Sequence, residues 1–372
     1  MLRINELRVP LLKEYDKNQP EHHLTDGQED KLNGQLHEQL HAAIVQRLNI
    51  SADELVSFTV FKRSYDARKV REIFLSYSVD VVLTDEQKVL AQCADDRHVM
   101  VSPDTSYHFV AQIDEFPSNK QRPIVVGFGP CGLFAALLLA QMGLKPIVLE
   151  RGREVRQRTK DTWGLWRKRV LNPESNVQFG EGGAGTFSDG KLYSQIKDPK
   201  FYGRKVIAEF VKAGAPPEIV YVNKPHIGTF RLVGVIEKMR AEIIALGGEV
   251  RFESRVVDIL LENGAIEGVQ LADGSILNSR HVVLALGHSA RDTVQMLHER
   301  GVFMEAKPFS VGFRVEHPQY MIDKARFGEY AGHPVLGAAD YKLVHHASNG
   351  RSVYSFCMCP GGTVVAATSE PN

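Results

Sequence analysis

The sequence has no excess of charge of either sign, few cysteines and no long apolar run. Its 45 Lys and Arg balance its 45 Asp and Glu, which argues against a protein that coats nucleic acid or anionic lipid by electrostatic attraction. Its four cysteines are too few and too scattered for a disulfide framework, which favours a reducing compartment. The longest apolar run, 133–140, is far shorter than the roughly 20 residues of a membrane-spanning helix. We therefore expect a cytoplasmic protein with no membrane as a partner.

The first 118 residues predict a small α/β domain of their own. Their apolar residues recur with the periods of helices and strands. In chain order the predicted elements are a strand at 7–12, a helix at 32–44, strands at 55–61 and 73–83, and a helix at 84–94. This order is compatible with a ferredoxin-like sandwich. Pro117 and Pro123, in a polar stretch, mark a linker. The predicted domains are 1–118 and 119–372, the second with 156–248 and 303–372 as inserted or substrate-side segments.

The second domain opens with the pattern of a Rossmann-like dinucleotide-binding fold. An apolar strand at 124–126 leads into Gly127, Gly129 and Gly132, and a helix rich in alanine and leucine follows. Gly127 permits the tight turn, Gly129 lets the backbone approach a pyrophosphate, and Gly132 permits close packing of the helix against the strand. A glycine-rich connector that binds nothing is the alternative, but strand, glycines and helix all stand where the mechanism needs them.

The residues around this turn extend the pattern. The start of the helix, at Pro130 and Cys131, offers the free N–H groups that follow the proline and the positive end of the helix dipole to phosphate oxygens. Glu150 follows Gly127 by 23 positions and ends the next apolar strand, close to the spacing of about 20 expected for an acid that binds ribose hydroxyls. A carboxylate there would repel a 2′-phosphate, so we expect FAD or NAD rather than NADP. Arg151, the next residue, is a candidate for the pyrophosphate.

A second glycine-rich stretch lies at 180–192. It does not follow a strand pattern, so it is not a second fingerprint. Its backbone N–H groups can approach a flavin or a pyrophosphate, and a surface loop is the alternative. The candidate cofactor-binding residues of this stretch are Gly182, Gly183, Ala184, Gly185 and Ser188.

Five longer motifs resemble the family of uncharacterised FAD-dependent dehydrogenases, a group of NAD(P)/FAD-dependent oxidoreductases. They are KRSYDAR at 62–68, GEGGAGTFSDGKL at 180–192, ALGHSARD at 285–292, PFSVGFRVEHPQ at 308–319 and SFCMCPGG at 355–362. The resemblance spans nearly the whole chain. It implies FAD as the cofactor and a glutathione-reductase-type FAD-binding fold. In such folds a segment corresponding to Val256 passes the adenine, and a strand ending in small residues, here Ala285 and Gly287, lies beside FAD.

The same resemblance bears on the end of the chain. Proteins of this class return late in the sequence with a glycine-containing strand and helix that close over the pyrimidine side of the flavin. No such pattern follows Cys359. We therefore expect that the chain is truncated at its C-terminus and that part of the catalytic face is missing.

Few side chains are candidates for the chemistry itself. A positive charge near flavin N1 stabilises the reduced anion, and Lys191 and Arg291 can supply it; the alternative for Lys191 is a solvated loop residue. His288 can donate a proton, or can make only a backbone hydrogen bond at a helix entry. Cys357 and Cys359 have neither the CxxC spacing of a redox site nor partner ligands for zinc, so we expect a buried strand with alternate cysteines and no metal site.

Together these features predict an FAD-dependent oxidoreductase that passes hydride between an unidentified small-molecule substrate and the flavin N5. NAD(P)H is the transient electron donor in this prediction. One alternative is an FAD-dependent tRNA-modifying protein, because the run 151–169 holds eight basic residues with Trp163 and Trp166 among them. We expect that run to be a solvated helix face, and we expect no nucleic acid as a partner. The other alternative is a non-catalytic flavin-binding protein.

Overall fold

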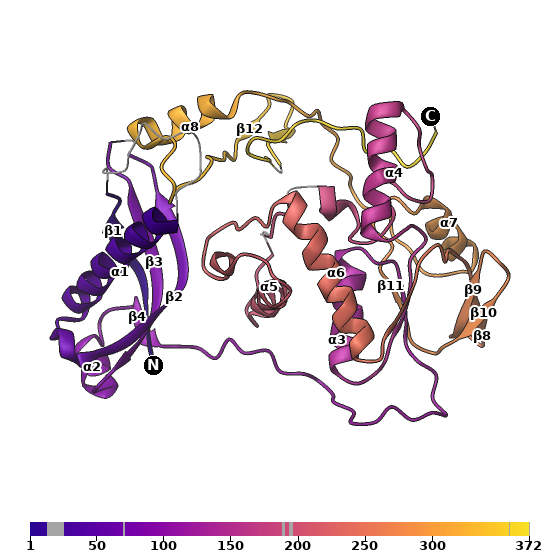
Figure 1. Ribbon diagram of the computed structural model, residues 1–372, viewed down its shortest axis with the longest axis horizontal. Coiled ribbons are helices and arrows are strands. Elements are labelled where there is room, and N and C mark those ends of the chain that lie inside the picture. The colour runs from indigo at the N-terminus through magenta and orange to yellow at the C-terminus, as the bar shows by residue number, and fades with distance from the viewer. Residues whose placement is uncertain (13–25, 70, 188–189, 193–195, 357, 372) are drawn as a thin grey trace. The chain divides into compact units, whose positions relative to one another are not determined.

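The computed structural model describes the chain apart from residues 13–25, 70, 188–189, 193–195, 357 and 372 (Figure 1). The described residues form two compact units. Unit 1 comprises Met1–Thr105, Val220–Pro225 and Val315–Thr363; unit 2 comprises Ser106–Ile219, His226–Arg314 and Val364–Asn372. Each unit is therefore assembled from segments that lie far apart in the sequence.

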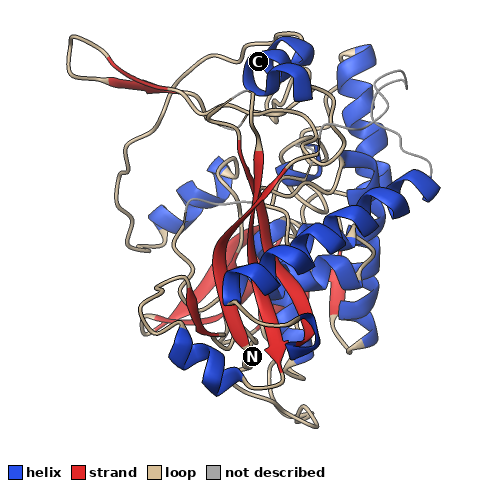
Figure 2. Cartoon of the chain, turned by 90° about the vertical axis from the view of Figure 1, so that its left-hand side faces the viewer, coloured by secondary structure: helices blue, strands red, loops and turns tan. Residues whose placement is uncertain are grey.

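Unit 1 is built on an antiparallel sheet with two helices on one face. Its first elements are β1 (Leu2–Pro10), α1 (Asp26–Leu48), η1 (Ala52–Glu54), β2 (Leu55–Asp66), β3 (Phe74–Leu83), α2 (Glu86–Gln92) and β4 (Val99–Val101). The strand order is β2-β3-β1-β4, and Figure 2 draws the strands of this sheet in red next to the N-terminus. Alternate residues of β3, such as Tyr77 and Val79, are buried with Leu40 and Ile44 of α1. The β-α-β-β-α-β order is that of ferredoxin-like domains.

A late segment of the chain joins the core of unit 1. It contains α8 (Gln319–Phe327), η4 (Gly328–Tyr330), β12 (Val344–His346) and β13 (Ser352–Tyr354). Phe327 is fully buried in the same cluster as the strands of the N-terminal sheet, and its ring meets that of Tyr65 edge to face at 5.3 Å. The sequence pattern assigns 303–372 to the second domain as an inserted or substrate-side segment, whereas the structure packs 315–363 with the first 105 residues. Periodicity shows that a helix has an apolar face, but not which of two cores covers it.

The expected strand through Cys357 and Cys359 is not found at Cys359. Cys357 lies outside the described residues, and Cys359 is a free, half-buried thiol in irregular chain rather than on a strand. The apolar alternation around it does not produce a paired strand, because Met358 and Cys359 lie just before the turn at Gly361.

Unit 2 is a mixed α/β unit around a parallel sheet, as predicted. Its strands are β5 (Ile124–Val126), β6 (Ile147–Leu149), β7 (Glu249–Arg251), β8 (Val256–Glu262), β9 (Ala265–Leu271), β10 (Ile276–Asn278) and β11 (Val282–Leu284). Its helices are α3 (Pro130–Gln141), α4 (Val155–Lys168), η2 (Ala184–Phe187), α5 (Tyr202–Lys212), η3 (Pro217–Val220), α6 (Thr229–Ala245) and α7 (Arg291–Glu299). The parallel sheet has the order β11-β5-β6-β7, and β10-β9-β8 form a separate antiparallel sheet.

The core of unit 2 lies between the parallel sheet and two helices. Leu133 and Leu137 of α3 and Val235 and Met239 of α6 are buried in one cluster with Val148 of β6, and the two helices lie side by side (Figure 1). Among the described residues, no helix is both long and apolar enough to cross a membrane. Because β5, β6 and β11 are parallel, their carboxyl ends meet at one edge of the sheet, which is where ligands bind in such folds.

Candidate functional site

A cavity of about 320 Å³ lies at the carboxyl edge of the parallel sheet. It is lined by the glycine-rich turn after β5, the end of β6, the loop before η2, the start of β8 and the turn after β11. Many of the sequence candidates line it: Gly127, Gly129, Pro130, Cys131, Glu150, Arg151, Gly183, Ala184, Gly185, Val256, Ala285, Gly287 and His288. Segments separated by more than 150 residues thus supply one enclosed space.

Other candidates lie elsewhere. Gly132 is buried behind the turn and Gly182 behind the glycine-rich loop, packed against Thr186 and Ile236. Lys191 forms an isolated antiparallel bridge with His226, and neither Lys191 nor Arg291 lines the cavity. Arg291, the first residue of α7, is exposed and lies 3.4 Å from Glu370. Ser188 lies outside the described residues.

The glycine-rich turn brings α3 to the cavity end-on. Gly127 has φ +97°, and a Cβ there would lie 2.5 Å from the carbonyl oxygen of Ala285, so only glycine fits. Gly129 is the N-cap of α3 and makes no side-chain cap. The first turn of α3 therefore presents its N–H groups and the positive end of its dipole to the cavity, an arrangement suited to an anion.

Gly132 fixes how closely α3 approaches the turn. A Cβ at this position would lie 1.9 Å from the carbonyl oxygen of Gly127, a backbone atom that cannot move independently. We expect Gly132→Ala to lower the free energy of unfolding by about 1–3 kcal/mol, the usual cost of overpacking a buried contact. Urea unfolding followed by the fluorescence of Trp163 and Trp166, both on α4 of unit 2, measures this. An unchanged midpoint would contradict the close packing.

Glu150 links the turn to the two loops beside it. Its carboxylate is buried and accepts hydrogen bonds from the N–H groups of Phe128 at 2.7 Å, Gly152 at 2.8 Å and Gly180 at 3.0 Å. Oε1 accepts two of these bonds and Oε2 accepts one. A carboxylate has about four acceptor positions, so Oε2 keeps room for one further donor such as a ribose hydroxyl.

A buried arginine holds the glycine-rich loop in place. Arg158 on α4 is fully buried and donates to the carbonyl oxygens of Asn176 at 2.8 Å, Val177 at 2.8 Å and Glu181 at 2.6 Å. Burial lowers the pKa of Arg158 to about 10, although the negative charges of Glu150 and Glu181 raise it. The guanidinium thus stays charged at neutral pH and is bonded to carbonyls rather than to a carboxylate.

Glu181 attaches the same loop to two helices. Its Oε2 accepts a hydrogen bond from the N–H of Val155 at 2.7 Å and forms an ion pair with Arg240 at 3.0 Å. Its Oε1 is buried and has no hydrogen-bond partner among the described residues. Burial raises the pKa of Glu181 to about 7, while the hydrogen bond from Val155 and the charge of Arg240 lower it.

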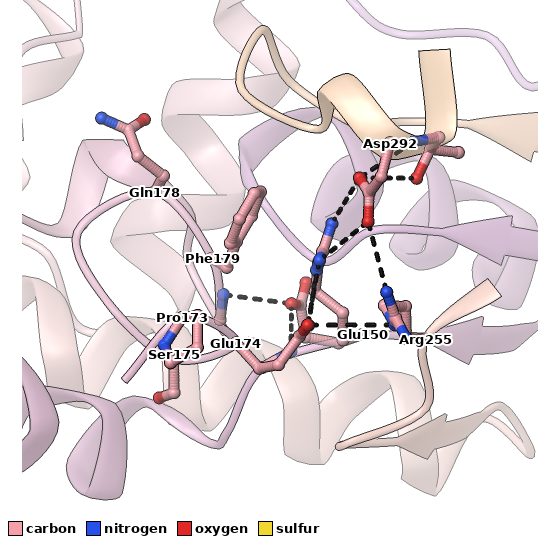
Figure 3. Close-up of polar contacts among 12 residues, drawn as sticks. Glu150, Pro173, Glu174, Ser175, Gln178, Phe179, Arg255 and Asp292 are labelled. Carbon is pink, nitrogen blue, oxygen red and sulfur yellow. Dashed lines mark hydrogen bonds and ion pairs between the residues drawn. The ribbon is translucent and has the colours of Figure 1, made fainter. Parts of the chain in front are cut away.

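Four charged side chains form a network at one end of the cavity. Arg151 bonds to Glu174 at 2.8 and 3.2 Å and to Asp292 at 3.0 and 3.1 Å. Arg255 reaches Asp292 at 3.4 Å and Glu174 at 3.9 Å (Figure 3). The Arg151 guanidinium also lies over the ring of Phe179, 4.1 Å from its centroid. We name these four residues, Arg151, Glu174, Arg255 and Asp292, the rim network.

Two further arginines on or near α4 form ion pairs within unit 2. Arg153 pairs with Glu253 at 3.1 Å, and Arg156 pairs with Glu237 at 2.6 Å. With Arg158 buried and Arg151 in the rim network, half of the eight basic residues in 151–169 bind partners inside the unit. No cluster of three or more potential metal ligands occurs in the part of the chain that the structure describes.

Sequence reasoning missed Arg158, Glu174 and Asp292. Arg158 stands in a run of basic residues typical of a solvated helix. Its spacing from Val155 and Thr162, which are the other buried residues of α4, is the signal that places it on the inner face. Glu174 and Asp292 carry no local signal, because each meets its partners only through tertiary packing.

Two family models match parts of the chain. Residues 308–372 match the family described as FAD-dependent protein, C-terminal domain-like, and residues 32–82 match a domain of unknown function. An uncharacterized protein of Clostridium beijerinckii is 46% identical over 336 residues, which cover 89% of this chain and 61% of that protein. A dual trans-enoyl reductase/FAD-dependent monooxygenase of Aspergillus terreus is 29% identical over 186 residues, 47% of this chain and 23% of that protein. The chain thus spans less than two thirds of either relative.

Solved structures with partial likeness include two of similar coverage. THI4 of Thermovibrio ammonificans has a TM-score of 0.32 at 18% identity, and the matched region covers 50% of this chain and 64% of the THI4 chain. An L-amino acid deaminase of Proteus vulgaris has a TM-score of 0.33 at 14% identity, and the matched region covers 53% of this chain and 61% of the deaminase chain. The family match is limited to residues 308–372, which resemble the C-terminal domain of an FAD-dependent protein.

Proposed function

We propose that the chain is part of an FAD-dependent oxidoreductase that transfers hydride between a small-molecule substrate and the flavin. The observation that carries this proposal is the convergence, in one cavity, of an uncapped helix start, a buried carboxylate with a spare acceptor position and a glycine-rich loop. These groups suit a diphosphate, a ribose and a planar ring respectively. When bound, the flavin would supply the redox chemistry.

The residues of this chain would bind and orient the cofactor. The N–H groups opening α3, near Pro130 and Cys131, would hold the diphosphate, and Oε2 of Glu150 would accept a ribose hydroxyl. Val256 would contact the adenine. The glycine-rich loop at Gly183, Ala184 and Gly185, together with Ala285 and Gly287, would line the rest of the cofactor site.

His288 is the proposed proton donor, because it lines the cavity and is exposed to it. Its ring lies 3.4 Å from the hydroxyl of Ser289, a contact that orients the imidazole. Lys191 and Arg291 do not line the cavity, so we do not assign them a role at the flavin. NAD(P)H is proposed as a transient electron donor.

A small-molecule substrate is favoured over RNA. A nucleic acid site combines free cations with stacking rings. Arg151, Arg153, Arg156 and Arg158 are held by partners within unit 2, so half of the eight basic residues in 151–169 are not available to RNA, and Lys160, Arg167, Lys168 and Arg169 remain. Retention on RNA that weakens with salt would instead support the tRNA-modifying alternative. A bound flavin that no donor reduces would support a non-catalytic role.

The first test of this proposal is Gly129→Ala. Gly129 has φ −72°, which any residue adopts, and its added Cβ would lie 3.6 Å from Cα of Gly183, an ordinary contact. We therefore expect the fold to keep its stability, whereas the methyl group would occupy the space through which a pyrophosphate approaches the backbone. The affinity for FAD, measured by flavin fluorescence titration, should fall at least tenfold.

The matched control is Gly234→Ala. Gly234 lies within α6 of the same unit, and a Cβ there would meet nothing within 4 Å, so FAD affinity should stay unchanged. A wild-type protein that is colourless and takes up no added FAD would overturn the proposal. Equal FAD affinity in Gly129→Ala and wild type would overturn the assigned position of the pyrophosphate.

A further inference from the structure

The rim network contains two arginines beside the proposed ribose site whose guanidinium groups already face carboxylates. Arg151 and Arg255 both line the cavity, in company with Glu150. Arg151 uses Nε, Nη1 and Nη2 on two carboxylates. Arg255 shares the same two carboxylates. Glu174 and Asp292 themselves are not part of the cavity wall.

The rim network and Glu150 together hold more acidic than basic side chains. Two guanidinium groups face the carboxylates of Glu174 and Asp292, and the buried carboxylate of Glu150 lines the same cavity. With all three acids ionised, these five groups carry one net negative charge. Burial raises the pKa of Asp292, but the hydrogen bonds and the charge of Arg151 bring it below its ordinary value. This acid is therefore ionised at neutral pH.

An arginine near the adenosine ribose is the feature that accommodates a 2′-phosphate in nucleotide-binding folds. A guanidinium binds phosphate best through two parallel hydrogen bonds. On Arg151, carboxylates occupy all three guanidinium nitrogens. On Arg255, Nη1 donates to Asp292 at 3.4 Å and Nε lies 3.9 Å from Glu174. A 2′-phosphate would have to displace an acid from Arg151, would share Arg255 with Glu174 and Asp292, and would also meet the carboxylate of Glu150.

We propose that Glu174 and Asp292 determine the nucleotide specificity of this cavity. The carboxylates of these two residues compete with a 2′-phosphate for Arg151 and Arg255. This competition restricts the site to adenosine nucleotides with an unphosphorylated ribose. The inference rests on the proposed nucleotide site and adds to it a pair of specificity-determining residues. They act through two arginines and need not touch the nucleotide.

The test compares the affinities of 5′-ADP and adenosine 2′,5′-bisphosphate by isothermal titration calorimetry. The wild type should bind 5′-ADP more tightly. In the double variant Glu174→Gln/Asp292→Asn both arginines are released and the net charge of the five groups becomes one positive. The ratio of the two dissociation constants should then shift at least tenfold toward the bisphosphate, and the shift should shrink as salt is added.

Two further variants keep the result interpretable. Asp292→Asn alone retains the bonds between Arg151 and Glu174 and should shift the ratio at least threefold even if the double variant does not fold. Asp258→Asn is the control, because it removes an acid from the ion pair with Arg300, and neither residue lines the cavity. It should leave the ratio unchanged.

The outcomes separate the two proposals. If both nucleotides weaken by the same factor, Glu174 and Asp292 only brace the cavity, and the specificity role is overturned. An unchanged ratio in folded variants overturns it as well. If the wild type binds no 5′-ADP, the proposed function fails, and the specificity role fails with it.

Discussion

Arg158→Met is expected to lower the free energy of unfolding of unit 2 by at least about 3 kcal/mol. Methionine fills much of the same volume but donates no hydrogen bond. The carbonyl oxygens of Asn176, Val177 and Glu181 would each lose a donor in a site closed to water. An unsatisfied buried polar group costs about 1–3 kcal/mol, and three are left at once. Urea unfolding followed by tryptophan fluorescence measures the loss, because both tryptophans lie on α4.

Arg156→Met is the matched control. Arg156 lies two residues earlier on the same helix, but its side chain is 65% exposed and pairs with Glu237 at the surface. Exposed ion pairs contribute little to stability, so this variant should unfold at nearly the same urea concentration as the wild type. Equal losses in the two variants would contradict the view that the buried carbonyl bonds, rather than the charge, are what Arg158 contributes.

The part of the site that the sequence predicts is the part that short-range rules govern. The positions of Gly127, Gly129 and Glu150 follow from a strand, a tight turn and a helix within a few dozen residues, and these local elements form as expected. The parallel sheet follows from the same pattern. The residues that resist prediction are those whose partners come from distant segments, such as Glu174 and Asp292, which meet Arg151 across the cavity mouth.

Two misreadings have the same physical origin. A run of basic residues indicates a solvated helix on average, yet α4 turns one arginine inward because the loop packed against it offers carbonyls without other donors. Likewise, the sequence pattern assigns 303–372 to the second domain, whereas the burial of α8 among the strands of unit 1 depends on packing between segments more than 200 residues apart. The strand β4 is missed for a simpler reason: three residues are too few to display an alternation.

Glu181→Gln is expected to remove a pH dependence of stability on the order of 3 kcal/mol. The Glu181 side chain is fully buried, and burial raises its pKa from 4.5 to about 7. Between these two values the folded chain keeps a proton that the unfolded chain releases. Stability therefore falls as the pH rises through this window, by about 1.4 kcal/mol for each unit between the two pKa values. Below pH 4.5 both states hold the proton, and above pH 7 both have lost it, so the slope from this group vanishes on either side.

The measurement is the difference in free energy of unfolding between variant and wild type, taken from pH 4 to pH 8. Glutamine keeps an oxygen for the N–H of Val155 but cannot ionise, so the difference should move in favour of the variant as the pH rises and should level off near pH 8. Glu237→Gln is the opposite control: a hydrogen bond from Arg156 lowers the pKa of Glu237, so its contribution is lost as the pH falls, not as it rises. A flat difference for Glu181→Gln would mean that the pKa of Glu181 is the same in the folded and the unfolded chain, because the hydrogen bond from Val155 and the charge of Arg240 then offset the effect of burial. The glycine-rich loop would then be held at neutral pH by a fully ionised Glu181, rather than by one that loses its proton near neutrality.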